Sequence, residues 1–521
     1  MSDMIIKLLM LVAFFGLMVV IGFYCRRHAG SVDGFVLGGR SVGAWFTAFA
    51  YGTSYFSAVI LVGYSGQFGW KYGTASTWIG IGNAVIGSYL AWTILGRRTR
   101  IMTQHLESKT MPDFFEKRYH SRSLKFGAAL IIFIFLIPYA ASLYNGLSRL
   151  FSMAFNIDYT VCIIVMTVLT AVYVVAGGYM ATVVNDFVQG IIMLVGIVLI
   201  VWASLRQFGG LHQAMLSLAQ VNDPSVSPAP GTFTSFFGPD PFNLLWVVVL
   251  TSLGTWSLPQ MTQKFYAIRN EAAIVKGTVI STLFAFVVAG GCYFLGGFGR
   301  LLSGTVDVNA QGYDAIIPKM FEAFSPAMMG LVVILVLAAS MSTLSSLVLT
   351  SSSTLTLDLI QPRKRVKLDE KHLLSTMRWL ILVFIALSAV IAIIQFKLRI
   401  TFIAQLMGLS WGAMAGAFMG PYLYGLYSRR ITVPAVWVSF LFGVGTMLLN
   451  MFFRAAFPVW FQSPINCGGF VMLASLVLVP LVSRFTKAPS PEHVEQVFSC
   501  YGKKVTVTAK ESIGDQTVGA K

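Results

Sequence analysis

Charged residues are scarce in this chain. They make up 11% of its 521 residues, whereas hydrophobic residues make up 56%. Apolar runs long enough to cross a bilayer recur along nearly the whole length. The composition therefore excludes a soluble protein and indicates an integral membrane protein.

Cysteine and histidine are also few, and their positions exclude other classes. The five cysteines are scattered without metal-site spacing, and most lie in or next to apolar runs, so disulfides are not implied. The six histidines all fall outside the predicted spans, which disfavours a membrane-embedded enzyme with clustered catalytic groups. A small-residue cleavage site is missing after the first apolar run, so we expect that run to be retained.

The apolar runs predict an all-α protein with about thirteen transmembrane helices. Runs of this length are typical of helices, because the strands of a membrane barrel show weak alternation over about 10 residues. The predicted spans are 5–24, 43–64, 75–96, 126–155, 159–178, 182–205, 241–263, 277–298, 327–350, 376–396, 401–427, 431–453 and 467–484.

Acidic residues number 20 against 37 Lys and Arg, and the basic residues flank the spans. Most lie in alternate loops, above all 97–125, 264–276 and 359–378, and in the tail after Arg484. The positive-inside rule then places the N-terminus outside and the C-terminus inside. We interpret the basic residues as topology and lipid contacts, which excludes nucleic acid as a partner. No Lys or Arg is expected near the midplane.

We expect one transmembrane domain over 1–484 and a polar cytoplasmic tail over 485–521. The tail is too short for a signalling domain, which disfavours a transporter-like solute sensor. The 97–125 loop is amphipathic and is predicted to lie along the inner surface.

Two predicted spans carry matching interruptions. The second span contains Gly52-Thr53-Ser54-Tyr55 and the seventh contains Gly254-Thr255-Trp256, followed by Pro259. Broken helices at corresponding places in two halves indicate a transporter's binding site. The alternative is a pair of glycine-containing packing helices.

Hydroxyl groups are dense at 338–346, which reads AASMSTLSS inside an apolar stretch. Ala339, Ser342 and Thr343 share one helical face, and Ser345 and Ser346 repeat the spacing. Neutral oxygens can replace the water around a small hard cation. Packing between helices through small hydroxylated residues explains the same pattern.

Asp186 is the one acidic residue predicted inside a span, in the first turn of the sixth. It could interact with the helix N-terminus, carry protons or bind a cation. Serine hydroxyls beside a carboxylate suit Na⁺, which suggests pairing Asp186 with Ser345 and Ser346.

Taken together, these segments resemble the sodium/solute symporter family, which includes proline, pantothenate, sialic acid, monocarboxylate and sugar transporters. The resemblance covers roughly residues 5–455. The similar segments are FVLGGRSVG (35–43), GTSYFSA (52–58), TMPDFFEKRY (110–119), GGYMATVVNDFVQG (177–190) and AASMSTLSS (338–346).

The resemblance implies a LeuT-type fold with two inverted five-helix repeats, here roughly 43–205 and 241–427. It also implies a main Na⁺ site formed by the carbonyls of Thr53, Phe56 and Ala339 with the hydroxyls of Ser342 and Thr343. Some members hold a second Na⁺, and the matching residues here are Asp186, Ser342, Ser345 and Ser346. Proline transporters carry Asp where this chain has Tyr55, which argues against a strict proline transporter.

We predict a Na⁺-coupled symporter in the cell membrane that imports a small polar solute, a carboxylate or an amino acid-like molecule. An H⁺-coupled symporter using Asp186 is the alternative. The solute is expected between the two breaks, where the candidate contacts are Tyr55, Ser57, Tyr139, Thr255, Trp256, Gln260, Gln405 and Trp411.

Overall fold

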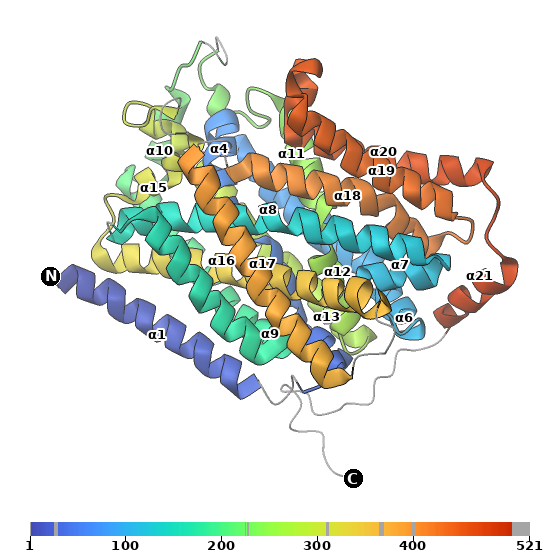
Figure 1. Ribbon diagram of the computed structural model, residues 1–521. Helices are drawn as coiled ribbons and strands as arrows, with labels where there is room; N and C mark the ends of the chain where they lie inside the picture. Colours follow the sequence, from blue (N-terminus) through green and yellow to red (C-terminus); the bar gives the residue numbers. More distant parts are fainter. Residues whose placement is uncertain are drawn as a thin grey trace.

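The computed structural model describes residues 2–25, 30–155, 157–224, 226, 229–308, 312–363, 369–398 and 403–502. The described residues form helices and loops, with an isolated backbone bridge between Val42 and Ile268 (Figure 1). The predicted all-α class is confirmed.

The helices of the first half begin with a long peripheral helix and continue through several short ones. In chain order they are α1 (Ser2–Cys25), α2 (Val32–Leu37), α3 (Ala44–Tyr55), α4 (Ser65–Tyr72), α5 (Thr77–Gly82), α6 (Arg97–His105), α7 (Met111–Tyr119), α8 (Arg122–Phe155), α9 (Tyr159–Gln207) and α10 (Leu211–Ala219). Wider π-helical turns η3 (Val59–Tyr64), η5 (Asn83–Leu90) and η6 (Trp92–Gly96) are inserted among them.

The second half contains a second interrupted helix and a group of long ones. These are α11 (Pro241–Leu253), the 3₁₀ turn η8 (Gly254–Trp256), α12 (Pro259–Ala267), α13 (Glu271–Gly296), α15 (Ile316–Phe321), α16 (Pro326–Thr354), η11 (Leu355–Ile360), α17 (Glu370–Leu398), α18 (Ile403–Tyr427), α19 (Val433–Phe452), α20 (Pro464–Phe485) and α21 (Pro491–Phe498).

Nine helices among the described residues are long and apolar enough to cross a membrane, or ten if the bent pair α11–α12 counts as one span. The predicted number of thirteen is therefore not confirmed. One reason is that interruptions shorten the predicted spans: α3 has 12 residues, and the apolar helix Tyr159–Val172 is too short. The predicted orientation of the termini stays a prediction.

Both predicted breaks are present. After α3, Phe56 is extended (φ −87°, ψ 111°), and the Ser57 hydroxyl accepts a hydrogen bond from Val59 N at 3.3 Å as the next helical segment begins. After α11, Leu258 is extended and Pro259 occupies the first position of α12, where its fixed φ and missing N–H are tolerated. The two parts of this second helix are bent by 41°.

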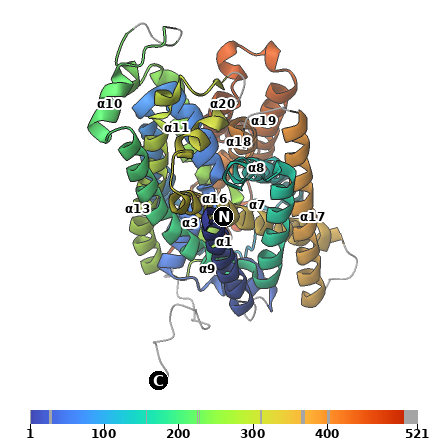
Figure 2. The ribbon, with the colours of Figure 1, turned by 90° about the vertical axis from the view of Figure 1, so that its left-hand side faces the viewer.

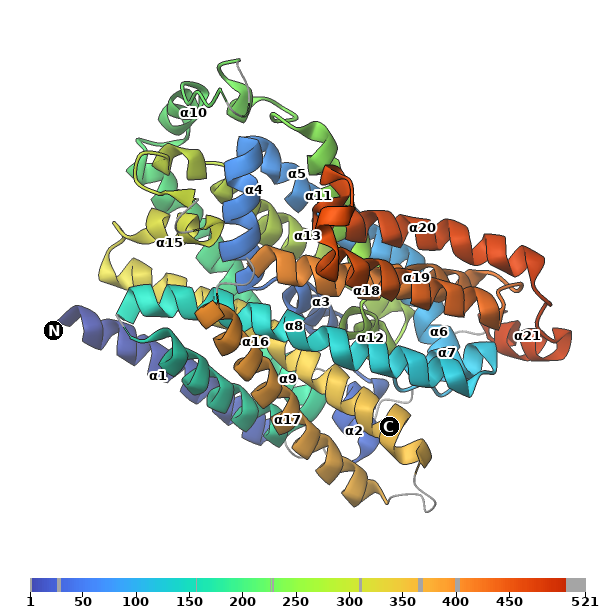
Figure 3. The same cartoon turned by 45° about the horizontal axis from the view of Figure 1, so that its top comes forward.

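The helix that carries the dense hydroxyls lies at the centre of the molecule. In the segment Pro326–Ile360, which contains α16, 89% of the residues in the most apolar 18-residue stretch are buried. The corresponding share in α1 is 17%, and α1 lies on the outside of the bundle, nearest the viewer in Figure 2. α16 packs against α9, α8, α17 and α3. α18, α19 and α20 pack on one another as a separate group beside α8 and α11 (Figure 3). The core therefore surrounds α16.

Glycine permits two features of this packing. Gly178 divides α9 with φ 58° and ψ −151°, a conformation open to a residue without Cβ. Gly69 of α4 lies so close to α13 that a Cβ would fall 1.9 Å from Gly296 O. The predicted boundary between the fifth and sixth spans coincides with the Gly178 break.

Candidate functional site

The first break brings five oxygen atoms together against α16. Ser342 Oγ lies 3.1 Å from Thr53 O and 3.0 Å from Ala339 O, and it donates to both. Thr343 Oγ1 lies 3.0 Å from Thr53 O, 3.4 Å from Phe56 O and 3.1 Å from Ala339 O. These are the five groups predicted for the main Na⁺ site, and all are buried.

The local backbone explains why these oxygens are free to converge. The last carbonyls of a helix lack intrahelical partners, and α3 ends at Tyr55, so Thr53 O and Phe56 O are available. Ser342 and Thr343 lie three and four residues after Ala339, so their side chains fold back over Ala339 O. The five-oxygen cluster therefore forms because α3 ends beside the middle of α16.

The cluster contains neutral oxygens alone, which suits a hard monovalent cation. Among the described residues, no three His, Cys, Asp or Glu side chains gather as a metal-binding group. The chemistry of this site therefore disfavours a transition metal.

A second polar group lies one turn further along α16. Lys264 Nζ donates to Ser346 Oγ at 3.0 Å and lies 3.7 Å from Asp186 Oδ2. Ser346 Oγ in turn lies 3.0 Å from Ser54 Oγ on α3. Lys264 is 2% exposed and Asp186 is fully buried. An ion pair is thus enclosed where α3, α9, α12 and α16 meet.

This group corrects two sequence-based expectations. The expectation that a loop begins at residue 264 is wrong, because α12 continues to Ala267 and Lys264 is buried within it. The placement of Asp186 in a first helical turn is also wrong, because this part of α9 begins at Gly178. The helix dipole acts within the first turn and does not explain Asp186.

The four residues matched to a second Na⁺ site do not share one set of contacts. Asp186 and Ser346 both contact Lys264. Ser345 Oγ donates to Ser342 O at 3.0 Å, whereas the Ser342 hydroxyl belongs to the five-oxygen cluster.

Four of the predicted solute contacts are large, buried side chains. Tyr139 of α8 meets Trp411 of α18 edge to face, with ring centroids 6.0 Å apart. A Cβ on Gly254 would lie 3.4 Å from the Trp411 ring, so this pair lies against the second break. Tyr55 Oη and both amide atoms of Gln260 are buried without a hydrogen-bond partner. Such groups need a partner, and a bound polar molecule can supply one.

The other predicted contacts have structural roles or lie further out. Thr255 Oγ1 donates to Gly87 O at 3.2 Å, and Trp256 Nε1 donates to Ile86 O at 2.9 Å. Tyr51 Oη, on the helix before the first break, also donates to Gly87 O, at 2.8 Å. Ser57 begins the helical segment after that break, and Gln405 is half-buried in the first turn of α18.

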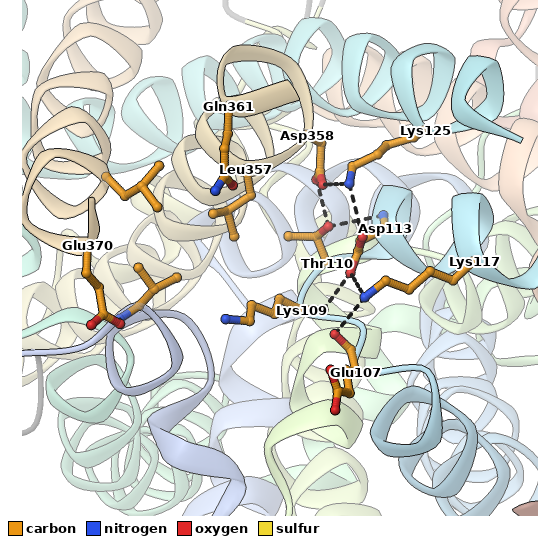
Figure 4. A pocket seen from close by; sticks show the side chains of 12 residues that line it. Glu107, Lys109, Thr110, Asp113, Lys117, Lys125, Leu357, Asp358, Gln361 and Glu370 are labelled. Carbon is orange, nitrogen blue, oxygen red and sulfur yellow. Dashed lines mark hydrogen bonds and ion pairs between the residues drawn. The ribbon is translucent and has the colours of Figure 1, made fainter. Parts of the chain in front are cut away.

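A cavity of about 400 Å³ with charged walls is lined by residues of α2, the 107–110 segment, α7, α8, η11 and α17 (Figure 4). Lys125 Nζ contacts three carboxylates, those of Asp113 at 3.0 Å, Glu116 at 2.8 Å and Asp358 at 3.5 Å. Asp358 also accepts from Thr110 Oγ1 at 2.6 Å and is buried, so Asp186 is not the sole buried acid of the spans. Sequence reasoning missed this cluster, because its residues look like ordinary loop charges.

Replacing Lys125 by Met is expected to lower the thermal unfolding midpoint of the purified protein. The change leaves the buried Asp358 without its cation, at a cost of about 1–3 kcal/mol. Lys117 provides a matched control, because it pairs with the same Asp113 from a side chain that is 36% exposed. Lys117→Met should cost less than about 1 kcal/mol. Equal unfolding midpoints for the two variants would show that the contacts of Lys125 with the three carboxylates do not stabilise the protein more than the exposed Lys117 pair does.

Comparison with known proteins places the whole arrangement in context. The model of the Sodium:solute symporter family matches residues 35–443. The osmoregulated proline transporter OpuE of Bacillus subtilis is 28% identical over 481 residues, covering 92% of this chain and 94% of that protein. Sodium/proline symporter 2 of Staphylococcus saprophyticus is 26% identical over 502 residues, covering 92% and 93%.

Among solved structures, a substrate-bound, outward-open Na⁺-coupled sialic acid symporter superposes with a TM-score of 0.70 at 15% identity. The match covers 93% of this chain and 99% of that chain. At this identity the likeness shows a shared transporter fold.

Proposed function

Because the chain belongs to the sodium:solute symporter family, we propose that it is a Na⁺-coupled symporter of the cell membrane that imports a small polar solute by alternating access. Members of this family and the curated relatives are transporters, not enzymes. The observation that carries the proposal is the convergence of Thr53 O, Phe56 O, Ala339 O, Ser342 Oγ and Thr343 Oγ1 at the first break.

Sodium at this position links the solute site to the membrane potential. A Na⁺ ion bound to the five oxygens would join the unwound end of α3 to α16, so its arrival and departure would favour different positions of these helices. Inward movement of one positive charge at about −100 mV supplies about 2.3 kcal/mol. The concentration gradient adds to this driving force.

The solute is proposed to lie beside the two breaks. We place Tyr55, Tyr139, Gln260 and Trp411 in contact with it, and we keep Ser57, Thr255, Trp256 and Gln405 as candidates for the surrounding wall. All four carry polar atoms without a hydrogen-bond partner: the hydroxyls of Tyr55 and Tyr139, the amide of Gln260 and the indole N–H of Trp411. A carboxylate or an amino acid-like molecule fits these donors, as it fits the proline named for the relatives.

Uptake into proteoliposomes tests the coupling ion. A thermal-shift screen with amino acids, small carboxylates and sugars, each with and without Na⁺, first identifies the solute. Uptake of that solute should then follow an imposed Na⁺ gradient and should fail with a pH gradient alone. Accumulation driven by the pH gradient without Na⁺ would contradict Na⁺ coupling and would favour proton coupling through Asp186.

A further inference from the structure

Lys264 places a basic amino group inside the helix bundle, beside the carboxylate of Asp186. It touches three groups from two other helices: Ser346 Oγ of α16 at 3.0 Å, Asp186 Oδ2 of α9 at 3.7 Å, and the Tyr179 ring of α9, whose centroid is 5.2 Å away. A carboxylate oxygen, a hydroxyl and an aromatic face are all groups that stabilise a cation. The Lys264 amino group thus lies in a buried site whose groups favour its protonated form.

The same carboxylate and hydroxyl are the groups that a free Na⁺ would need. Within the part of the chain that the structure describes, the oxygens of Asp186 make no hydrogen bond, and the charged group in contact with them is Lys264 Nζ. A Na⁺ ion bound to Asp186 Oδ2 would lie next to the Lys264 ammonium, which is 3.7 Å from this oxygen, and two like charges so close together repel strongly away from water. The ammonium and a Na⁺ ion are therefore alternative occupants.

We propose that Lys264 is a tethered cation that occupies this site in place of a second Na⁺, so that the protein binds and moves one Na⁺ per solute. The inference rests on the proposed Na⁺ coupling and adds its stoichiometry. The five-oxygen cluster holds the ion that is exchanged, whereas the positive charge one turn further along α16 remains with the protein. In this structure the Lys264 side chain thus links the second broken helix to α9 and α16.

Equilibrium binding of ²²Na⁺ to the purified full-length protein in nanodiscs tests the inference without knowledge of the solute. Choline chloride keeps the ionic strength constant. The wild-type protein should bind one Na⁺ per chain. Lys264→Met removes the ammonium and keeps an apolar stem of similar length, so Na⁺ can reach Asp186 and binding should rise to two. Lys264→Arg keeps the charge and should still bind one.

The double variant Lys264→Met/Asp186→Asn is the matched control, because it removes both charges and should return binding to one. Two Na⁺ ions per wild-type chain would overturn the inference while leaving Na⁺ coupling intact. No bound Na⁺ would instead refute the proposed function. A folded Lys264→Met variant that still binds one Na⁺ would show that the ammonium does not block a site. If Lys264→Met does not fold, the wild-type and Lys264→Arg stoichiometries decide between one ion and two.

Discussion

Replacing Ser342 and Thr343 together by alanine is expected to raise the Na⁺ concentration for half-maximal uptake by about a hundredfold. Each hydroxyl is proposed to contact the ion, and a contact to a charged group contributes about 1.5 kcal/mol or more. Losing two such contacts costs about 3 kcal/mol, and each 1.4 kcal/mol corresponds to a factor of ten. Uptake measured against Na⁺ concentration in proteoliposomes provides the comparison.

The same helix supplies the control for this experiment. Ser352 Oγ and Ser353 Oγ are buried in α16 but donate to carbonyls of their own helix, Leu349 O and Thr350 O, both at 3.1 Å. Alanine at both positions removes two hydroxyls without touching the five-oxygen cluster, so the half-saturating Na⁺ concentration should stay near that of the wild type. An unchanged value in the Ser342/Thr343 variant would remove the main ion site from this position.

Gln260→Leu is expected to weaken solute binding by about tenfold and at the same time to raise the unfolding midpoint of the solute-free protein. Both amide atoms of Gln260 are buried without a partner, which costs about 1–3 kcal/mol in the absence of solute. Leucine removes this cost and also removes a solute contact. Titrating the identified solute at saturating Na⁺, together with thermal unfolding without solute, measures the two effects.

Gln263, three residues further along α12, should behave in the opposite way. Its Oε1 accepts from Thr350 Oγ1 at 2.8 Å, and its Nε2 donates to Val36 O at 3.0 Å. Gln263→Leu therefore breaks two buried hydrogen bonds, so it should lower the unfolding midpoint and leave solute affinity unchanged. If Gln260→Leu also destabilises the protein without changing solute affinity, Gln260 does not line the solute site.

The sequence predicts the two breaks well because their cause is local. Pro259 has no N–H and so cannot continue the helix that precedes it. The Gly-Thr-Ser run before Phe56 has low helix propensity, which favours the end of α3 there. The resemblance to a family then indicated which oxygens face the first break, and the structure brings those five together. The segment taken alone leaves both explanations of the α16 hydroxyls open and favours helix packing over ion binding.

Lys264 was missed because the pattern around it is that of a loop. It is followed within a few residues by Arg269, Asn270 and Glu271, which are typical of a membrane boundary. The signal that could have found it is Asp186, since an acid buried among membrane helices requires a partner. The contact joins residues 78 positions apart by number, from 186 to 264, and such long-range pairing is invisible to a reading of local periodicity.

A single carbonyl oxygen contacts residues at both helix breaks. Gly87 O accepts from Tyr51 Oη, which precedes the first break, and from Thr255 Oγ1, which lies in the second. It belongs to η5, a π-helical segment, and such segments are frequent at functional sites. The Thr255 hydroxyl also reaches Ser252 O of its own segment at 2.8 Å, so the second break can move away from Gly87 without leaving this hydroxyl unpaired, whereas Tyr51 Oη would lose its bond to Gly87 O. Gly87 O is therefore a common anchor point through which η5 contacts both broken helices.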